Sequence, residues 1–178
     1  MGISGRFLHV GGGPITVGND TLPDWAVGCV ETRLDIEPDV QPDILASMTD
    51  MGDIGGFNFV FSCHALEHLY PHDVPIALAE HYRVLADGGI AITIVPDLTG
   101  IEATDEPVYE SYSGPITGLD MIYGKASFVA DSIYMAHHTG FTEKTLRAAY
   151  EQAGFTEISV KPVQCHSIMC MGKKKCQD

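Results

Sequence analysis

The sequence predicts a single α/β domain, residues 1–178, built around a mostly parallel β-sheet. Three observations support this prediction. Short strand-like segments alternate with helical segments along the chain, as they do in parallel α/β folds. Residues 90–95 (IAITIV) form a continuous, largely β-branched run, which is typical of a strand buried on both faces. The length of 178 residues suits one domain, and a composition of 45% hydrophobic and 19% charged residues is globular.

Seven segments are expected to be strands. The fourth alternates and follows the turn Gly55-Gly56, and the last two are expected to form an antiparallel hairpin at one edge of the sheet, joined by a connection longer than a tight turn. The expected strands are residues 6–10, 30–36, 44–45, 57–61, 90–95, 157–160 and 168–171.

Two segments are expected to be helices. Residues 73–85 place Ile76, Leu78 and Tyr82 at helical spacings, with Pro75 in the first turn and a glycine pair at residues 88–89 as the stop signal. Residues 142–153 begin at a capping threonine, Thr142, and end before a glycine. Between these helices, residues 98–140 show no sustained period, and so long a loop inside a compact domain is usually either functional or wrongly assigned as irregular.

The charge of the chain argues against two classes of partner. It carries 24 acidic and 10 basic residues, a formal net charge of −14. Such a chain repels a phosphate backbone and an anionic membrane surface, so neither nucleic acid nor membrane is expected as a partner. Five scattered cysteines without a CxxC pair, and a start without a signal-peptide core, predict a soluble cytoplasmic protein.

A glycine cluster follows the first predicted strand directly. Gly11, Gly12 and Gly13 would let backbone N–H groups approach a ligand closely, although a plain tight turn explains them equally well when they are taken alone. Asp35 closes the second strand about twenty residues later, where nucleoside-binding α/β folds place an acid that accepts both ribose hydroxyls. Alone, Asp35 fits a turn-capping role. The two features together favour a nucleoside site.

A competing motif follows the fourth strand. His64-Ala65-Leu66-Glu67-His68 satisfies the HxxEH pattern of a zinc hydrolase, in which two histidines bind the metal and the glutamate acts as base. Pro71 interrupts any helix within two turns, and no third ligand with a helix of its own is evident. A metal site is therefore not predicted, and Glu67 and His68 are expected to pin the turn by hydrogen bonds.

Several short motifs, taken in order, resemble the class I S-adenosylmethionine-dependent methyltransferases, and in particular a small bacterial group of predicted methyltransferases. The resemblance extends over nearly the whole chain. It rests on LHVGGG at residues 8–13, Asp35, SCHALEH at 62–68, RVLADGG at 83–89, VPDL at 95–98, Tyr123-Gly124, His137 with Gly140-Phe141, and AGF at 153–155. It departs from the family pattern at His9, Ser47 and Asp87, where the family usually has an acid, an aspartate and a proline.

The resemblance implies a Rossmann-like methyltransferase fold with a reduced first helix, and S-adenosylmethionine as cofactor. The glycines would face its methionine part, Asp35 would hold the ribose, and Ile36 would lie against the adenine. Ser47 and the backbone N–H of Met48 would serve the adenine ring. Ser62 and His64 would border the cofactor near its sulfonium.

On the acceptor side, His137 is the candidate general base, because it follows the insertion that is expected to cover the acceptor site. An exposed pair of loop histidines, His137 and His138, is an equally good interpretation. The acidic charge favours a small molecule or a sugar as the methyl acceptor. The alternative is a methyltransferase-like domain that binds a ligand without chemistry. Nucleoside-dependent stabilisation that is lost in Asp35→Ala is expected from the methyltransferase, and no such stabilisation is expected from the alternative.

Overall fold

A seven-stranded sheet forms the body of the protein. The computed structural model describes residues 5–13, 26 and 28–176. The strand order is β3-β2-β1-β4-β5-β9-β8, and all neighbouring pairs from β3 to β5 are parallel, whereas β9 runs antiparallel to both β5 and β8. The strands are β1 (Arg6–Val10), β2 (Val30–Asp35), β3 (Ile44–Leu45), β4 (Phe57–Cys63), β5 (Leu85–Pro96), β8 (Thr156–Val163) and β9 (Ser167–Lys173). The predicted fold class, including the edge hairpin, is confirmed.

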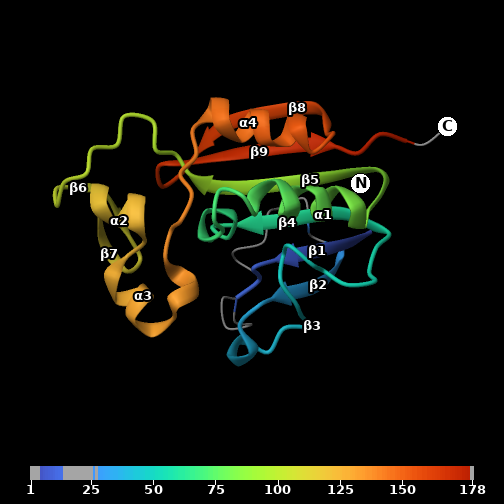
Figure 1. Ribbon diagram of the computed structural model, residues 1–178, viewed down its shortest axis with the longest axis horizontal. Helices are drawn as coiled ribbons and strands as arrows, with labels where there is room; N and C mark the ends of the chain where they lie inside the picture. Colours follow the sequence, from blue (N-terminus) through green and yellow to red (C-terminus); the bar gives the residue numbers. More distant parts are fainter. Residues whose placement is uncertain (1–4, 14–25, 27, 177–178) are drawn as a thin grey trace.

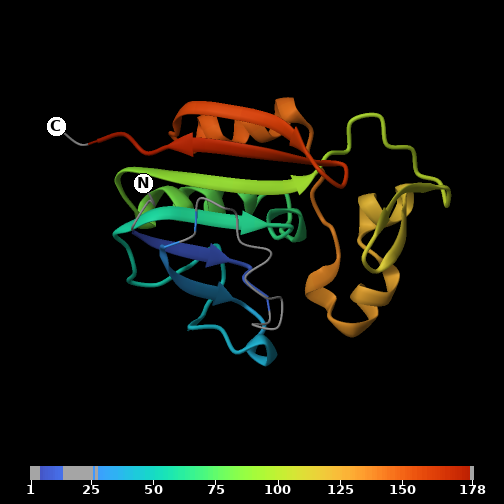
Figure 2. The same ribbon diagram turned by 180° about the vertical axis from the view of Figure 1, so that it is seen from behind.

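Two helices lie side by side on one face of this sheet (Figures 1 and 2). They are α1 (Val74–Val84) and α4 (Glu143–Gln152). Thr142 caps α4 through a reciprocal capping box with Thr145, as the sequence predicted. Both helices contribute to the main core, in which Leu78 and Tyr150 are fully buried.

The face of α1 that packs on the sheet differs from the expected one. Ile76 is 48% exposed, whereas Ala77, Leu78, His81 and Val84 are buried. A polar residue, His81, therefore occupies a core position. A pattern based on apolar residues alone could not find this face, because it excludes histidine.

The glycine pair after α1 lies inside a strand and does not end the helix. The helix gives way to β5 at Leu85, which pairs with Phe57, whereas Ile90 pairs with Phe59. The residues between these two pairs, including Gly88 and Gly89, therefore bulge out of the ladder. A Cβ on Gly89 would lie 2.9 Å from the carbonyl oxygen of Ala86, so this bulge requires glycine.

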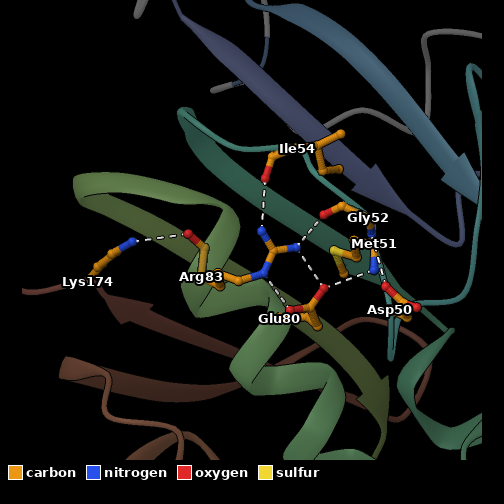
Figure 3. Close-up of polar contacts among 7 residues, drawn as sticks. All are labelled: Asp50, Met51, Gly52, Ile54, Glu80, Arg83 and Lys174. Atoms are coloured by element: carbon orange, nitrogen blue, oxygen red, sulfur yellow. Dashed lines mark hydrogen bonds and ion pairs between the residues drawn. The ribbon is translucent and has the colours of Figure 1, made fainter.

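Arg83 ties the end of α1 to the segment that leads into β4 (Figure 3). Its guanidinium donates to both carboxylate oxygens of Glu80, and to the carbonyl oxygens of Gly52 (2.8 Å) and Ile54 (3.1 Å). The Glu80 carboxylate in turn accepts a hydrogen bond from the backbone N–H of Met51. The pair thus orders the connection between β3 and β4.

Two other connections differ from the sequence expectation. The β8–β9 hairpin has a connection of residues 164–166, shorter than predicted, since both strands extend toward it. Cys165 and His166 both have positive φ angles, 59° and 46°, which allow the short reversal. The reduced first helix was predicted between β1 and β2, where residues 14–25 and 27 lie outside the described residues.

Residues 98–140, expected to be irregular, form a small lobe of short elements. The lobe lies beyond the carboxyl ends of the parallel strands (Figure 1). It comprises β6 (Pro107–Ser111), β7 (Gly114–Thr117), α2 (Gly118–Tyr123), α3 (Ala126–Asp131) and the 3-10 turn η5 (Ile133–Met135). Each element is too short to produce a sustained period in the sequence. Among the described residues, no helix is long and apolar enough to cross a membrane.

Candidate functional site

The candidate site lies at the carboxyl edge of the sheet, where the strand order reverses between β1 and β4. In open α/β sheets ligands bind at this switch point. The glycine loop leaves β1 here, and the N–H groups of Gly11 and Gly12 donate to the carbonyl oxygen of Leu34 at 2.9 and 3.3 Å. Gly11 has φ +67°, and a Cβ on it would lie 2.6 Å from the Cβ of Ala65 after β4. Glycine is therefore required where the two strand ends meet.

Asp35 and the glycine loop, which together predict a nucleoside site, contact each other in the structure. The Gly13 N–H donates to Asp35 Oδ2 at 3.0 Å, and the Glu37 N–H donates to Asp35 Oδ1 at 3.0 Å. Each carboxylate oxygen can accept a further hydrogen bond, so the two oxygens can still receive a vicinal diol. Apart from its chain neighbours, no described residue has an atom within 4 Å of a Cβ built on Gly13.

Arg33 holds the glycine loop in place by hydrogen bonds, and the sequence did not predict this role. Its side chain is buried, and the guanidinium donates to the carbonyl oxygens of Gly13 and Val40. It thereby joins the glycine loop to the segment after β2. The available signal was a basic residue two positions before Asp35 on the same face of the strand.

The residues predicted near the adenine lie next to Asp35. Ile36 is 44% exposed, so its apolar side chain is available to a ring. The N–H of Ala46 donates to the carbonyl oxygen of Asp35 at 3.0 Å, which holds the following Ser47 and Met48 nearby. The Ser47 hydroxyl accepts from the Thr49 N–H, whereas the Met48 side chain packs on the core.

Ser62 and His64 lie at the end of β4 but differ in environment. Ser62 is fully buried, and its hydroxyl bonds to Thr93 at 3.1 Å. The hydroxyl is thus part of the core, and the expected position of Ser62 beside the cofactor stays a prediction. His64 has φ 51°, and its exposed ring contacts Glu67 Oε1 through Nδ1 at 3.2 Å.

Glu67 is the buried centre of a polar cluster. It lies in the 3-10 turn η4 (Leu66–His68) and is 1% exposed. Burial alone would raise the pKa of Glu67, but the hydrogen bond from His64 and the nearby histidines outweigh it, so the pKa is lowered. The same interaction raises the pKa of His64, against the effect of burial. Among the described residues, Oε2 of Glu67 has no hydrogen-bond partner.

Two further histidines complete the cluster. His68 Nδ1 lies 3.1 Å from the carbonyl oxygen of Ala136, and Nε2 lies 3.2 Å from that of His64. His137 Nδ1 donates to the carbonyl oxygen of Met121 at 2.8 Å, because a carbonyl can only accept. Burial lowers the pKa of His137, although Glu67 opposes this effect. His137 is therefore a neutral imidazole near pH 7, and no described residue is hydrogen-bonded to its Nε2.

The lobe spans the carboxyl edge from β2 to β4. The Ser132 hydroxyl reaches Glu37 Oε2 at 3.4 Å, beside Asp35. The N–H groups of His138 and Thr139 both donate to the carbonyl oxygen of Glu67. The His138 ring stacks on Tyr70 and stays outside the cluster. The two histidines of the predicted loop pair therefore differ, and only His137 joins the cluster.

Residues 28–93 match the methyltransferase domain family model, over somewhat more than a third of the chain. The matched segment runs from β2 into β5 and includes Asp35 and the HALEH motif, but not the glycine loop or His137. No curated protein matches the sequence.

Solved methyltransferases share the fold. Human N-acetylserotonin methyltransferase in complex with SAM aligns with a TM-score of 0.62 and 14% identity, over 96% of this chain and 47% of that one. A Burkholderia thailandensis 1,6-didemethyltoxoflavin-N1-methyltransferase, with bound 1,6-didemethyltoxoflavin and S-adenosylhomocysteine, gives a TM-score of 0.61 and 16% identity, over 98% of this chain and 72% of that one. A SAM-dependent methyltransferase from Methanosarcina mazei gives a TM-score of 0.62 and 14% identity, over 98% and 94%. The chain therefore has the Rossmann-like methyltransferase fold, and it spans about half the length of the human enzyme.

Proposed function

We propose that this chain binds S-adenosylmethionine at the glycine loop and Asp35, and transfers its methyl group to a small molecule or a sugar. The observation that carries the proposal is the contact of Gly13 with Asp35 at the switch point of the sheet. The match of residues 28–93 to the methyltransferase domain model supports the same reaction class.

The residues present fit this cofactor. The methionine part would lie against the glycine loop at Gly13, where no described residue apart from the chain neighbours lies within 4 Å of a Cβ built on the backbone. Asp35 would accept hydrogen bonds from both ribose hydroxyls, and the exposed Ile36 would contact the adenine. Ser47 and the Met48 N–H would face the polar edge of the ring, and His64 would lie toward the reactive end.

Bound S-adenosylmethionine supplies an activated methyl group: the acceptor's lone pair forms the new bond to carbon while the carbon–sulfur electron pair stays on sulfur. The protein's task is then to align the acceptor and to remove its proton. His137 is the proposed base. Its Nδ1–H is anchored on Met121, so its neutral Nε2 can take the proton from an oxygen or nitrogen acceptor.

The lobe of residues 98–140 is proposed to cover the acceptor. Its contacts with Glu37 and Glu67 support this role, because they bridge the two sides of the carboxyl edge. The net charge of −14 favours a small molecule or a sugar over nucleic acid. We also propose a cytoplasmic location, since no disulfide joins the described cysteines.

A thermal melt with S-adenosylhomocysteine tests the cofactor site. At about a hundred times the dissociation constant, a ligand that binds only the folded chain adds about 2.7 kcal/mol of stability, which raises the melting temperature by several degrees. The wild type should show this rise and Asp35→Ala should not, while the control Asp39→Ala, an exposed acid in the neighbouring 3-10 turn, should behave as wild type. A cooperatively melting wild type without any rise would contradict the proposal.

A further inference from the structure

The HALEH motif and the lobe together assemble an arrangement that neither segment contains alone. One nitrogen each of His68 and His137 and one oxygen of Glu67 lie within 4.8 Å of one another. Two of these residues come from the turn after β4, and the third comes from the lobe about seventy positions later. The sequence pattern suggested His64 and His68 as ligands, with Glu67 as base. The geometry instead groups Glu67, His68 and His137.

We propose that Glu67, His68 and His137 bind a divalent transition-metal ion, for which zinc is the best match. Two imidazoles and one carboxylate form the ligand set of many catalytic zinc sites, which keep a fourth position open. Around a tetrahedral zinc ion the ligand atoms lie about 3.4 Å apart, given bond lengths of about 2.0–2.1 Å. The three ligand atoms, which lie within 4.8 Å of one another, would have to approach to that spacing when the ion binds.

An orphaned carboxylate oxygen points to a ligand. Glu67 is 1% exposed, and its Oε2 has no hydrogen-bond partner in the described part of the chain. Leaving such an oxygen buried and unpaired is costly, so buried groups of this kind normally have a partner. His64 holds the other oxygen, Oε1, at 3.2 Å and so fixes the orientation of the carboxylate.

Both histidines have the backbone anchor that metal-binding histidines usually have. A ligating imidazole typically donates its second N–H to a carbonyl or carboxylate, which fixes its orientation. His137 donates through Nδ1 to Met121, and this leaves Nε2 for the ion. His68 lies between two carbonyl oxygens, those of Ala136 and His64. It can keep the bond to Ala136 and turn Nε2 from His64 to the ion.

Binding of the ion stands independently of methyl transfer, whereas its part in the reaction rests on the proposed function. A bound ion with an open coordination position could take an acceptor oxygen as a further ligand and would lower the pKa of that oxygen. The Nε2 lone pair of His137 would then belong to the ion. His137 would act as a free base only in the metal-free protein.

Calorimetric titration of the chelator-treated full chain with zinc chloride tests the site. We expect one ion per chain, and a loss of affinity of more than about tenfold in Glu67→Gln and in His137→Gln. His138→Gln, which changes the neighbouring stacked histidine, should bind as wild type. Absence of stoichiometric binding, or unchanged affinity in both ligand variants, would overturn the proposal. If Glu67→Gln does not fold, His137→Gln decides, because His137 is only half-buried in the lobe.

Cobalt provides a second readout, because its absorption reports the ligands. Tetrahedral bands in the wild type that disappear in His137→Gln would support the site, whereas a thiolate charge-transfer band would assign the metal to cysteines and overturn it. Asp35→Ala should retain the metal while losing the nucleoside. Loss of one binding activity without the other would therefore show which of the two proposals has failed.

Discussion

Replacement of His81 by leucine should make the protein less sensitive to acid. His81 is fully buried in α1, and neither ring nitrogen has a hydrogen-bond partner among the described residues. Burial lowers the pKa of His81 and outweighs the nearby charge of Glu80, which raises it. The net result is a pKa of about 4 in place of the usual 6.5. The ring is therefore neutral in the folded protein at pH 7.

The direction of the pH effect follows from where the proton binds. Between pH 6.5 and 4 the unfolded chain binds a proton at this histidine and the folded protein does not. The proton on this histidine therefore leaves the unfolding free energy unchanged above pH 6.5 and lowers it as the pH decreases toward 4. From these two pKa values the loss in unfolding free energy is about 2 kcal/mol at pH 5 and about 3 kcal/mol at pH 4.

Urea denaturation followed by circular dichroism at pH 7 and pH 5 measures this loss. The wild type should lose about 2 kcal/mol more than His81→Leu between the two values, since all other titrating groups are common to both. At pH 7 the variant should be as stable as the wild type or more stable, because leucine removes an unsatisfied polar group from the core. The control His72→Leu, at a histidine whose side chain is 77% exposed, should keep the wild-type dependence. Parallel losses in wild type and His81→Leu would refute the reasoning.

Substitutions at three further positions, two of them with a comparison variant, test the packing that positions the site, each by its unfolding free energy in urea. Arg83→Ala should lower the unfolding free energy by about 1–3 kcal/mol. Arg83→Lys should recover only part of this loss, because one ammonium group cannot replace the planar guanidinium. Equal unfolding free energies of both variants and the wild type would contradict the role of Arg83. Gly172→Ala should cost about 1–3 kcal/mol, since its Cβ would lie 2.7 Å from Tyr150 Cδ1, whereas Gly55→Ala, with its nearest atom at 3.7 Å, should be tolerated. Tyr150→Phe should cost about 1 kcal/mol by removing the 2.7 Å hydrogen bond to Thr93, and a neutral effect would mean that this buried bond contributes nothing.

Local patterns in the sequence were sufficient for most of the fold. The continuous run of residues 90–95 identified a buried strand, and Thr142 marked the start of α4 where the structure has it. These features depend on neighbours in the chain, so the sequence displays them directly. The bulge in β5 could not be predicted, because it depends on the register of β5 against β4. The glycine pair in this bulge is equally consistent with the end of a helix.

In the candidate site, too, some features could be predicted from the sequence and others could not. The proximity of the glycine loop to Asp35 was predictable, because the loop follows β1 and Asp35 ends the neighbouring parallel strand β2. The cluster of Glu67 and His137 was not, since the lobe brings together residues that are distant in the chain and its elements are too short to be recognised. The role of Arg33 could not be predicted. Among the described residues its guanidinium bonds to backbone carbonyl oxygens, and the sequence does not reveal such partners.

Binding of S-adenosylmethionine at the glycine loop beside Asp35 can be tested directly by titrating the ¹⁵N-labelled chain with S-adenosylhomocysteine and following its amide NMR signals. Binding at this place should shift the signals of Gly11, Gly13 and Met48 and leave that of Gly172 unchanged, and the response should be lost in Asp35→Ala. A saturated titration that shifts other amides and leaves the glycine loop unchanged would contradict binding at this place.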